Sequence, residues 1–202
     1  MIAFKGLTAG MVAAMGSGHK VLEAGVVYRE ESSKTGRSGW HCTENPFDCL
    51  TYFRLGCGNR YFRVEASGSI DEDEANRISC TEITLLEELT VQKLAGYGMM
   101  YMVQHPARQN WEQSGAFISV KKETAEAAGE GHIAIARGTH PKVRGEEGAV
   151  LGIILEPQPG QVEAATLFTA DRQQAGKWWT VNEKRELIEV KDEEKTGRAD
   201  RA

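Results

Sequence analysis

The chain has 202 residues, of which 41% are hydrophobic and 26% are charged, and its formal net charge is −5. A chain of this length can bury about 70% of the surface that it exposes when unfolded, so one compact domain with at most a small appendage is expected. A protein that binds nucleic acid needs a basic surface to displace counterions from the phosphates, and the negative charge argues against that class. No stretch approaches the roughly 20 apolar residues of a transmembrane helix, and the interrupted apolar start does not fit a signal peptide, so we expect a cytoplasmic protein.

The first half of the chain reads as rich in β-strands. Apolar and polar residues alternate over short stretches that end at glycine or polar turns, the pattern of a half-buried strand. The stretches with this pattern are residues 2–5, 39–42, 59–70 and 78–86. We therefore predict a mixed, mainly antiparallel sheet in this half.

A helix-start signal follows the second of these strands. Asn45 is a good N-cap, Pro46 fits the first helical position, and Asp48 faces the positive end of the helix dipole. The signal predicts a brief helix from Pro46 to about Arg54, which glycines then end.

A second, longer helix is predicted over about residues 90–104. Thr90 can cap it, and Pro106 stops it. The apolar residues between them recur at helical spacing and predict one buried face: Val91, Leu94, Ala95, Gly98, Met99, Met102 and Val103.

The pattern of apolar and glycine residues changes beyond residue 112. Short apolar stretches with glycine corners, such as GAFISV and GHIAIARG, suggest the stacked coils of a β-solenoid. A hairpin is predicted over KWWTVNEKRELIEV at 177–190, and the charged residues 191–202 are predicted to be disordered. The predicted organisation is an α+β domain at 1–112, a β-rich solenoid remnant with a C-terminal hairpin at 113–190, and a disordered charged tail at 191–202.

One stretch concentrates residues that carry chemistry. Residues 39–53 read GWHCTENPFDCLTYF, and this stretch resembles a Gly-aromatic-His-Ala-Cys-Glu-x-Pro-Leu-Asp signature in an uncharacterised family of phage and prophage proteins. The similarity continues through NRYFRVEASGSI and ISCTEITLLEEL and returns in the C-terminal part, where the tandem repeats of many relatives look reduced to a remnant. The resemblance implies a phage-linked protein without an assigned activity.

One position departs from that signature. The cysteine of the family pattern would fall at Thr43, and Cys42 stands where alanine is usual. A mechanism that depended on the family's thiolate could not operate here unchanged.

Several interpretations of residues 39–53 are open. In the structural one, Trp40 and Phe47 are core residues and His41 hydrogen-bonds to Glu44. A zinc site would use His41 with Cys42, Cys49 or Cys57, but no C-x-x-C pair is present, and neighbouring strand residues point to opposite faces. We therefore predict no metal site. In a third interpretation, Cys49 near the helix start is a nucleophile beside His41.

The fourth interpretation is an enzyme. The order AFKG, GWHCTENPFDCLTYF, RYFRVEASG is similar to that of ADP-ribosyltransferase folds. The resemblance implies NAD as the cofactor, with Lys5, His41 and Thr43 holding the dinucleotide and Tyr52 stacking on a ring. Glu82 or Glu87 would polarise the ribose hydroxyl as positive charge develops at the anomeric carbon.

Catalysis is not the favoured function. We expect a phage or prophage accessory protein that acts through contacts with a protein partner or with itself, in the cytoplasm of the host cell, with no cofactor. The exposed backbone groups of solenoid edges favour homo-oligomers. One ring of the Trp178-Trp179 pair would face outward and is a candidate partner contact.

Overall fold

The computed structural model describes residues 1–13, 19–73 and 77–190, so the predicted disordered tail lies outside the described residues. The described fold is mostly β-sheet and contains two helices, a 3-10 helix and an α-helix. The elements in chain order are β1 (Ile2–Leu7), β2 (Val12–Ala13), β3 (Lys20–Val21), β4 (Val27–Arg29), β5 (Trp40–Thr43), η1 (Pro46–Thr51), β6 (Arg60–Glu72), β7 (Arg77–Leu89), α1 (Val91–Gln104), β8 (Gln113–Gly115), β9 (Ile118–Ala127), β10 (Ile133–Gly145), β11 (Val150–Leu155), β12 (Ala164–Thr169), β13 (Trp178–Val181) and β14 (Leu187–Glu189).

Four strands of the first half close on themselves. β1 pairs with β6, β6 with β7, β7 with β5, and β5 again with β1, and every pairing is antiparallel. We call this ring of β1, β5, β6 and β7 the N-terminal barrel. Its interior is apolar and includes Leu7, Trp40, Phe62 and Leu85.

The ring is closed unevenly. β1 and β6 pair over six residues, whereas β1 and β5 meet at a single pair, Phe4 opposite Thr43. We call the boundary between β1 and β5 the seam. Because few backbone hydrogen bonds join the two strands there, side chains must fill the seam.

Both helices begin where the sequence predicts. The Asn45 side chain accepts a hydrogen bond from the Phe47 N–H, and Pro46 opens the helix, but η1 is a 3-10 helix that ends at Thr51 rather than near Arg54. In α1 the Thr90 hydroxyl accepts from the Lys93 N–H. The predicted apolar face of α1 is confirmed at its centre, where Leu94, Ala95, Gly98, Met99 and Met102 are buried.

The second half of the chain forms a seven-stranded sheet. β9, β10 and β11 run parallel, with Ile118, Ile133 and Val150 in one register row, while β12 and β13 join antiparallel. Strands buried on both faces read as continuous apolar runs, and β10 follows this rule: Ile133 and Ile135 face one core cluster, and Ala134 and Ala136 face another.

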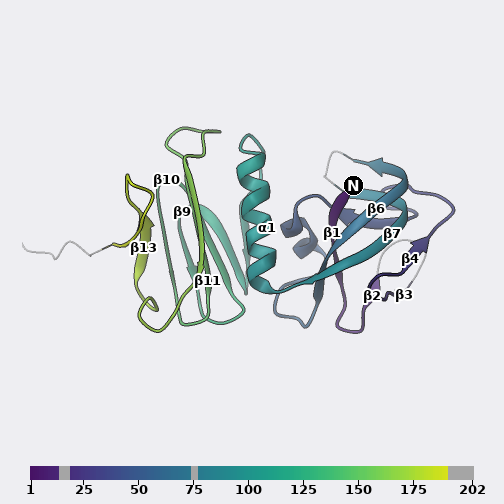
Figure 1. Cartoon of the computed structure of the whole chain (residues 1–202), viewed down its shortest axis with the longest axis horizontal. Helices are drawn as coiled ribbons and strands as arrows, with labels where there is room; N and C mark the ends of the chain where they lie inside the picture. The colour runs from purple at the N-terminus through teal and green to yellow at the C-terminus, as the bar shows by residue number, and fades with distance from the viewer. Residues whose placement is uncertain (14–18, 74–76, 191–202) are drawn as a thin grey trace, which may run out of the picture.

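The helix α1 lies between the barrel and this C-terminal sheet (Figure 1). One apolar cluster contains Phe4 and Phe47 from the first half, Met99 from α1, and Ile133 from the sheet. The two halves therefore share a core.

A buried ion pair stabilises the contact between the C-terminal sheet and the segment that follows α1. The Arg137 side chain on β10 is only 2% exposed, and its guanidinium donates to both carboxylate oxygens of Glu156, each at 2.7 Å. It also donates to the Pro106 carbonyl oxygen at 2.6 Å, and it stacks on the Trp111 ring. Two bonds in a fork to one carboxylate are the geometry that makes a buried arginine tolerable.

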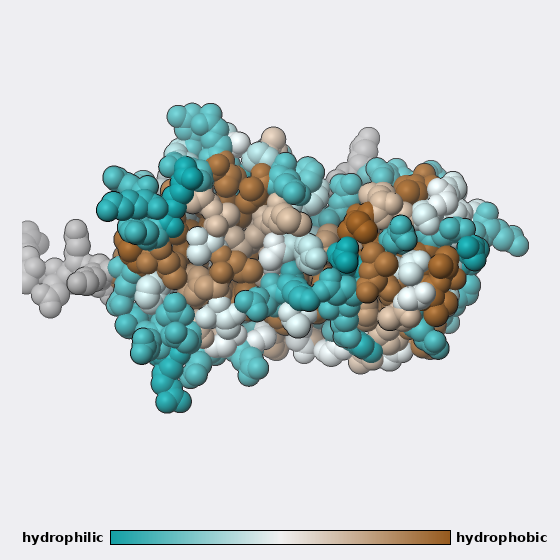
Figure 2. Space-filling view, viewed as in Figure 1, coloured by the Kyte–Doolittle hydropathy of each residue, from teal (hydrophilic) through white to brown (hydrophobic). Residues whose placement is uncertain are grey.

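The surface is uneven in polarity. On the face shown in Figure 2, hydrophobic residues gather in one area over the C-terminal sheet and in another over the barrel, with polar residues between them. In the part of the chain that the structure describes, no helix has the length and apolar character needed to cross a membrane.

Candidate functional site

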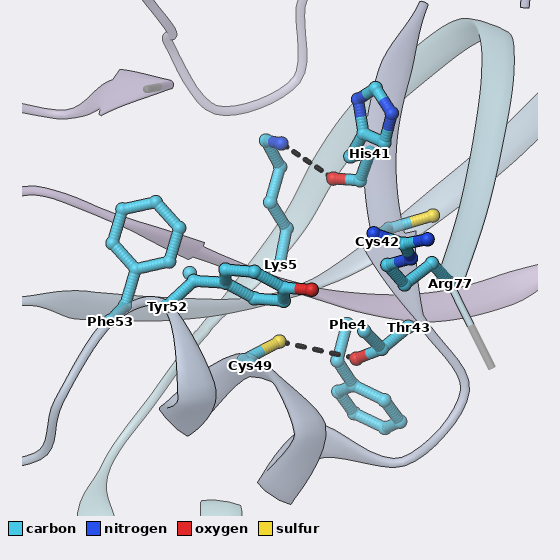
Figure 3. Close-up of a pocket in the computed structure, with 10 residues that line it drawn as sticks. Phe4, Lys5, His41, Cys42, Thr43, Cys49, Tyr52, Phe53 and Arg77 are labelled. Atoms are coloured by element: carbon cyan, nitrogen blue, oxygen red, sulfur yellow. Dashed lines mark hydrogen bonds between the residues drawn. The ribbon is translucent and has the colours of Figure 1, made fainter. Parts of the chain in front are cut away.

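A small cavity opens at the seam of the barrel (Figure 3). Its volume is about 30 Å³, which is room for about one or two water molecules. Residues of β1, β5 and β7 and of the end of η1 line it: Phe4, Lys5, Gly6, His41, Cys42, Thr43, Cys49, Tyr52, Phe53 and Arg77. We call it the seam cavity.

Local structure explains why these residues meet. The Asn45 cap starts η1 directly after β5, so that Tyr52 and Phe53 return across β1. Gly6 on β1 leaves room for the Phe53 ring, because a Cβ there would lie 2.5 Å from it. Arg77 opens β7 opposite Thr43 of β5.

Lys5 is the most unusual group in the cavity. It is only 4% exposed, and its Nζ donates a hydrogen bond to the His41 carbonyl oxygen across the seam at 2.6 Å. Among the described residues that line the cavity, none is a carboxylate. Burial away from water lowers the pKa of Lys5, and the neighbouring thiols of Cys42, Cys49 and Cys80 oppose this only in part.

The surroundings of the His41 ring favour its neutral form. It is 9% exposed, its Nε2 accepts a hydrogen bond from the Gly36 N–H at 2.9 Å, and Glu44, its predicted partner, is exposed. Burial lowers the pKa of His41, and the positive charge of Lys5 lowers it further. Because Nε2 accepts, the proton of the neutral ring lies on Nδ1, which makes no well-formed hydrogen bond to the described residues.

The thiol beside Thr43 does not have the character of a nucleophile. The Thr43 hydroxyl donates to the Asn45 carbonyl oxygen at 2.9 Å and lies 3.3 Å from Cys49 Sγ. Burial raises the pKa of Cys49 to about 11, so the group is a thiol at neutral pH. A reactive cysteine needs the opposite shift.

Tyr52 and Arg77 form the more polar side of the cavity. Tyr52 is 46% exposed and lies across the cavity in Figure 3, so it lines the cavity and also reaches solvent. The Arg77 Nε donates to Asp73 at 2.7 Å, and the Tyr52 hydroxyl interacts with the same guanidinium. Arg77 thus brings a second positive charge to the cavity.

The two predicted catalytic acids do not line the cavity. Glu82 bonds to Arg29, with 2.9 Å between Oε1 and Nε, and to the Ser67 hydroxyl. Glu87 binds Arg63 and Lys93. Both carboxylates therefore have basic or hydroxyl partners outside the cavity, on β4, β6 and α1.

Of the cysteines in the zinc hypothesis, Cys42 and Cys49 line the seam cavity with His41, whereas Cys57 does not. Cys42 and Cys49 are buried, while Cys57 is exposed. Within residues 1–13, 19–73 and 77–190, no three His, Cys, Asp or Glu side chains are placed to share one metal ion.

The structure therefore brings together four of the predicted site residues, Lys5, His41, Thr43 and Tyr52. Sequence reasoning missed Arg77 because nothing in its local pattern separates it from the other basic residues of the barrel. Only its register position opposite Thr43 places it at the cavity.

Comparison with known proteins gives one match. Residues 1–96 match the family described as a domain of unknown function (DUF7666), a range that contains the barrel, η1 and the start of α1. No curated protein and no solved structure matches the chain.

Proposed function

We propose that this chain is a phage or prophage accessory protein whose N-terminal barrel binds a small anionic group, a phosphate or a carboxylate, in the seam cavity. One observation carries the proposal: Lys5, a buried amine, and Arg77 line a cavity in which no described lining residue is a carboxylate. A buried cation is normally paired with an anion. Arg77 already has Asp73 as its partner, whereas Lys5 donates to the neutral His41 carbonyl oxygen, so a ligand would supply the anion for Lys5.

The cavity favours binding over catalysis. An enzyme that cleaves a glycosidic bond of NAD would need a carboxylate near the developing positive charge. Glu82 and Glu87 point to partners of their own instead. A dinucleotide is also far larger than a cavity of about 30 Å³, so the NAD alternative, which uses the same Lys5, His41, Thr43 and Tyr52, requires a large opening of the seam.

Anion binding is tested by stability in phosphate. At a phosphate concentration of 100 times its dissociation constant, the wild type should gain about 2.7 kcal/mol in free energy of unfolding. Lys5→Met should abolish this gain, since it removes the amine and keeps most of the side-chain volume. The measurement is urea unfolding with phosphate against chloride at equal ionic strength, with NAD and acetate as further ligands.

Lys121→Met is the matched control, because Lys121 is an exposed lysine on β9 and does not line the cavity. It should retain the whole gain. An equal gain in wild type and Lys5→Met would mean that phosphate acts on the whole surface, and the anion site would be rejected. A gain with NAD that exceeds the gain with phosphate would favour the dinucleotide alternative.

Self-association is a second candidate function, favoured by one strand. β12 is an edge of the C-terminal sheet, and its sequence AATLFT carries neither a charge nor a proline. Edge strands without such protection tend to pair with another chain. We expect light scattering at micromolar concentration to give a homo-oligomer, and Ala165→Lys together with Thr169→Lys to give a monomer; a monomeric wild type would contradict this candidate.

A further inference from the structure

The Lys5 amine in the seam cavity has a chemical property besides its charge, namely its nitrogen lone pair. Lys5 is the one buried lysine among the described residues, and its amine reaches into the cavity from β1 (Figure 3). Its bond to the His41 carbonyl oxygen uses one N–H and leaves the nitrogen lone pair free whenever the amine is neutral.

The surroundings favour the neutral amine. Aromatic rings of Phe4 and Phe53 line the cavity, and the Arg77 guanidinium lines it as well. Desolvation is one of the conditions that turn a lysine into a nucleophile near neutral pH. Burial does lower the pKa of Lys5 from its ordinary value of 10.5.

We propose that the Lys5 amine forms an imine with a small carbonyl compound that carries a carboxylate, of which glyoxylate is the simplest example. The carboxylate of this compound would occupy the position of the anionic ligand proposed above, so the placement of the compound rests on the proposed function. The carbonyl carbon would then lie within reach of Nζ.

The reaction is balanced without any further reactant. The Nζ lone pair attacks the carbonyl carbon, a C–N bond forms, and the carbonyl oxygen takes up the proton that the nitrogen loses. The resulting carbinolamine then expels its hydroxyl group as water, with one proton delivered to the hydroxyl and one lost from nitrogen. Tyr52 lines the same cavity, and its hydroxyl is the group that can relay these protons.

Access depends on Tyr52. Glyoxylate is larger than the closed cavity, and the Tyr52 side chain is 46% exposed on the solvent side. Rotation of this ring into solvent opens the cavity without moving the barrel strands. Exposed side chains change rotamer within nanoseconds, so this rotation does not limit the reaction.

Reductive trapping tests the imine directly. The folded full-length protein is incubated with glyoxylate and sodium cyanoborohydride at neutral pH, and each lysine is followed by peptide mass mapping. Lys5 should be carboxymethylated several-fold faster than Lys121, because its lowered pKa leaves more of the amine neutral at this pH. In urea the two lysines should react equally.

Lys5→Arg separates the two proposals. It removes the nucleophile and keeps a cation, so it should still be stabilised by phosphate, and its surface lysines should be labelled as in the wild type. In the wild type, phosphate should slow the labelling of Lys5.

Each possible failure has a distinct meaning. If Lys5 of the folded wild type reacts no faster than Lys121, the imine is rejected, whatever phosphate does to stability. If Lys5 reacts faster but equally well with propionaldehyde, and phosphate gives no protection, the amine chemistry stands and the anion site is rejected.

Discussion

Replacing Glu156 by glutamine is expected to lower the free energy of unfolding by about 3–5 kcal/mol, since breaking a buried ion pair leaves an uncompensated charge inside the protein. The Arg137 side chain is 2% exposed and the Glu156 side chain 11% exposed, and the two share a forked pair of hydrogen bonds. Urea unfolding at neutral pH measures the loss.

Glu126→Gln is the control for this substitution. It breaks the Arg144–Glu126 pair, whose side chains are 40% and 54% exposed, and exposed pairs contribute only about 0–1 kcal/mol. Hydrogen bonds from Arg137 lower the pKa of Glu156 below its ordinary value of 4.5. The stability that this carboxylate contributes is therefore present above pH 4.5 and lost as the pH falls through its folded-state pKa. The difference between wild type and Glu156→Gln should shrink over that acid range, and equal losses for the two variants at neutral pH would contradict the account.

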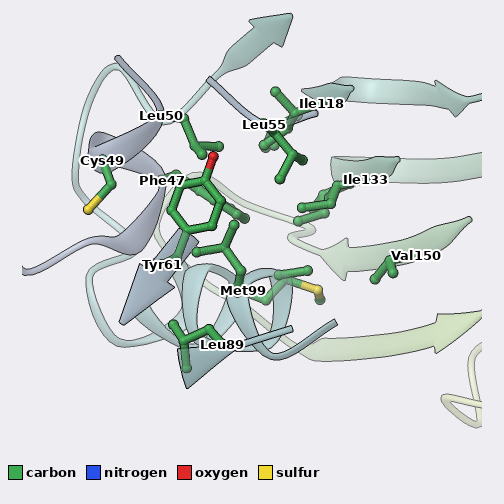
Figure 4. Close-up of a cluster of buried hydrophobic side chains, with 14 of the residues drawn as sticks. Phe47, Cys49, Leu50, Leu55, Tyr61, Leu89, Met99, Ile118, Ile133 and Val150 are labelled. Atoms are coloured by element: carbon green, nitrogen blue, oxygen red, sulfur yellow. The ribbon is translucent and has the colours of Figure 1, made fainter. Parts of the chain in front are cut away.

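Replacing Phe47 by alanine is expected to cost about 3–5 kcal/mol of unfolding free energy, the range for a buried aromatic side chain. Phe47 is 1% exposed and lies in the core between η1, α1 and the C-terminal sheet (Figure 4). Its ring packs against α1 at Gly98, where a Cβ would lie 2.3 Å from it. Urea unfolding followed by circular dichroism gives the loss.

Phe168→Ala is the comparison for Phe47. Phe168 is half-buried at the sheet edge, where it meets Trp179 edge-on, so its truncation removes less apolar contact. The loss should be clearly smaller than that of Phe47→Ala. Similar losses would mean that Phe47 does not join the two halves of the chain as the structure places it.

The sequence predicts those elements whose signals are local. Asn45 and Pro46 mark the start of η1, and Thr90 with Pro106 brackets α1, since capping and helix termination depend on neighbouring residues. The length of η1 was overestimated, because its 3-10 hydrogen bonding ends the helix at Thr51. The sequence of a short apolar helix does not indicate whether its hydrogen bonds are of the 3-10 or the α type.

Closure of the barrel could not be predicted from the same signals. β1 pairs with residues about 40 and 60 positions away along the chain, and a strand pattern does not specify its partners. The alternation expected for β6 also fails at Tyr61 and Phe62, which are both buried because the core surrounds both faces of that strand. The solenoid remains a prediction, to which the parallel register of β9, β10 and β11 lends support.

The candidate site was predicted in part. Lys5, His41, Thr43 and Tyr52 were selected on a resemblance in the order of motifs, and all four line the seam cavity. The chemistry of the cavity depends on two facts that the sequence does not show. Lys5 is desolvated, and Arg77 is a permanent cation among the described lining residues. Burial and charge pairing arise from the tertiary fold.

The titration of the Lys5 amine tests the anion site most directly. In protein with ¹⁵N-labelled lysine, NMR should find that Nζ titrates below its ordinary pKa of 10.5 and that saturating phosphate raises this pKa, because a bound anion stabilises the ammonium form. The Nζ signal of Lys121 in the same sample should be the same with and without phosphate. A Lys5 pKa that phosphate leaves unchanged would contradict an anion bound at this amine.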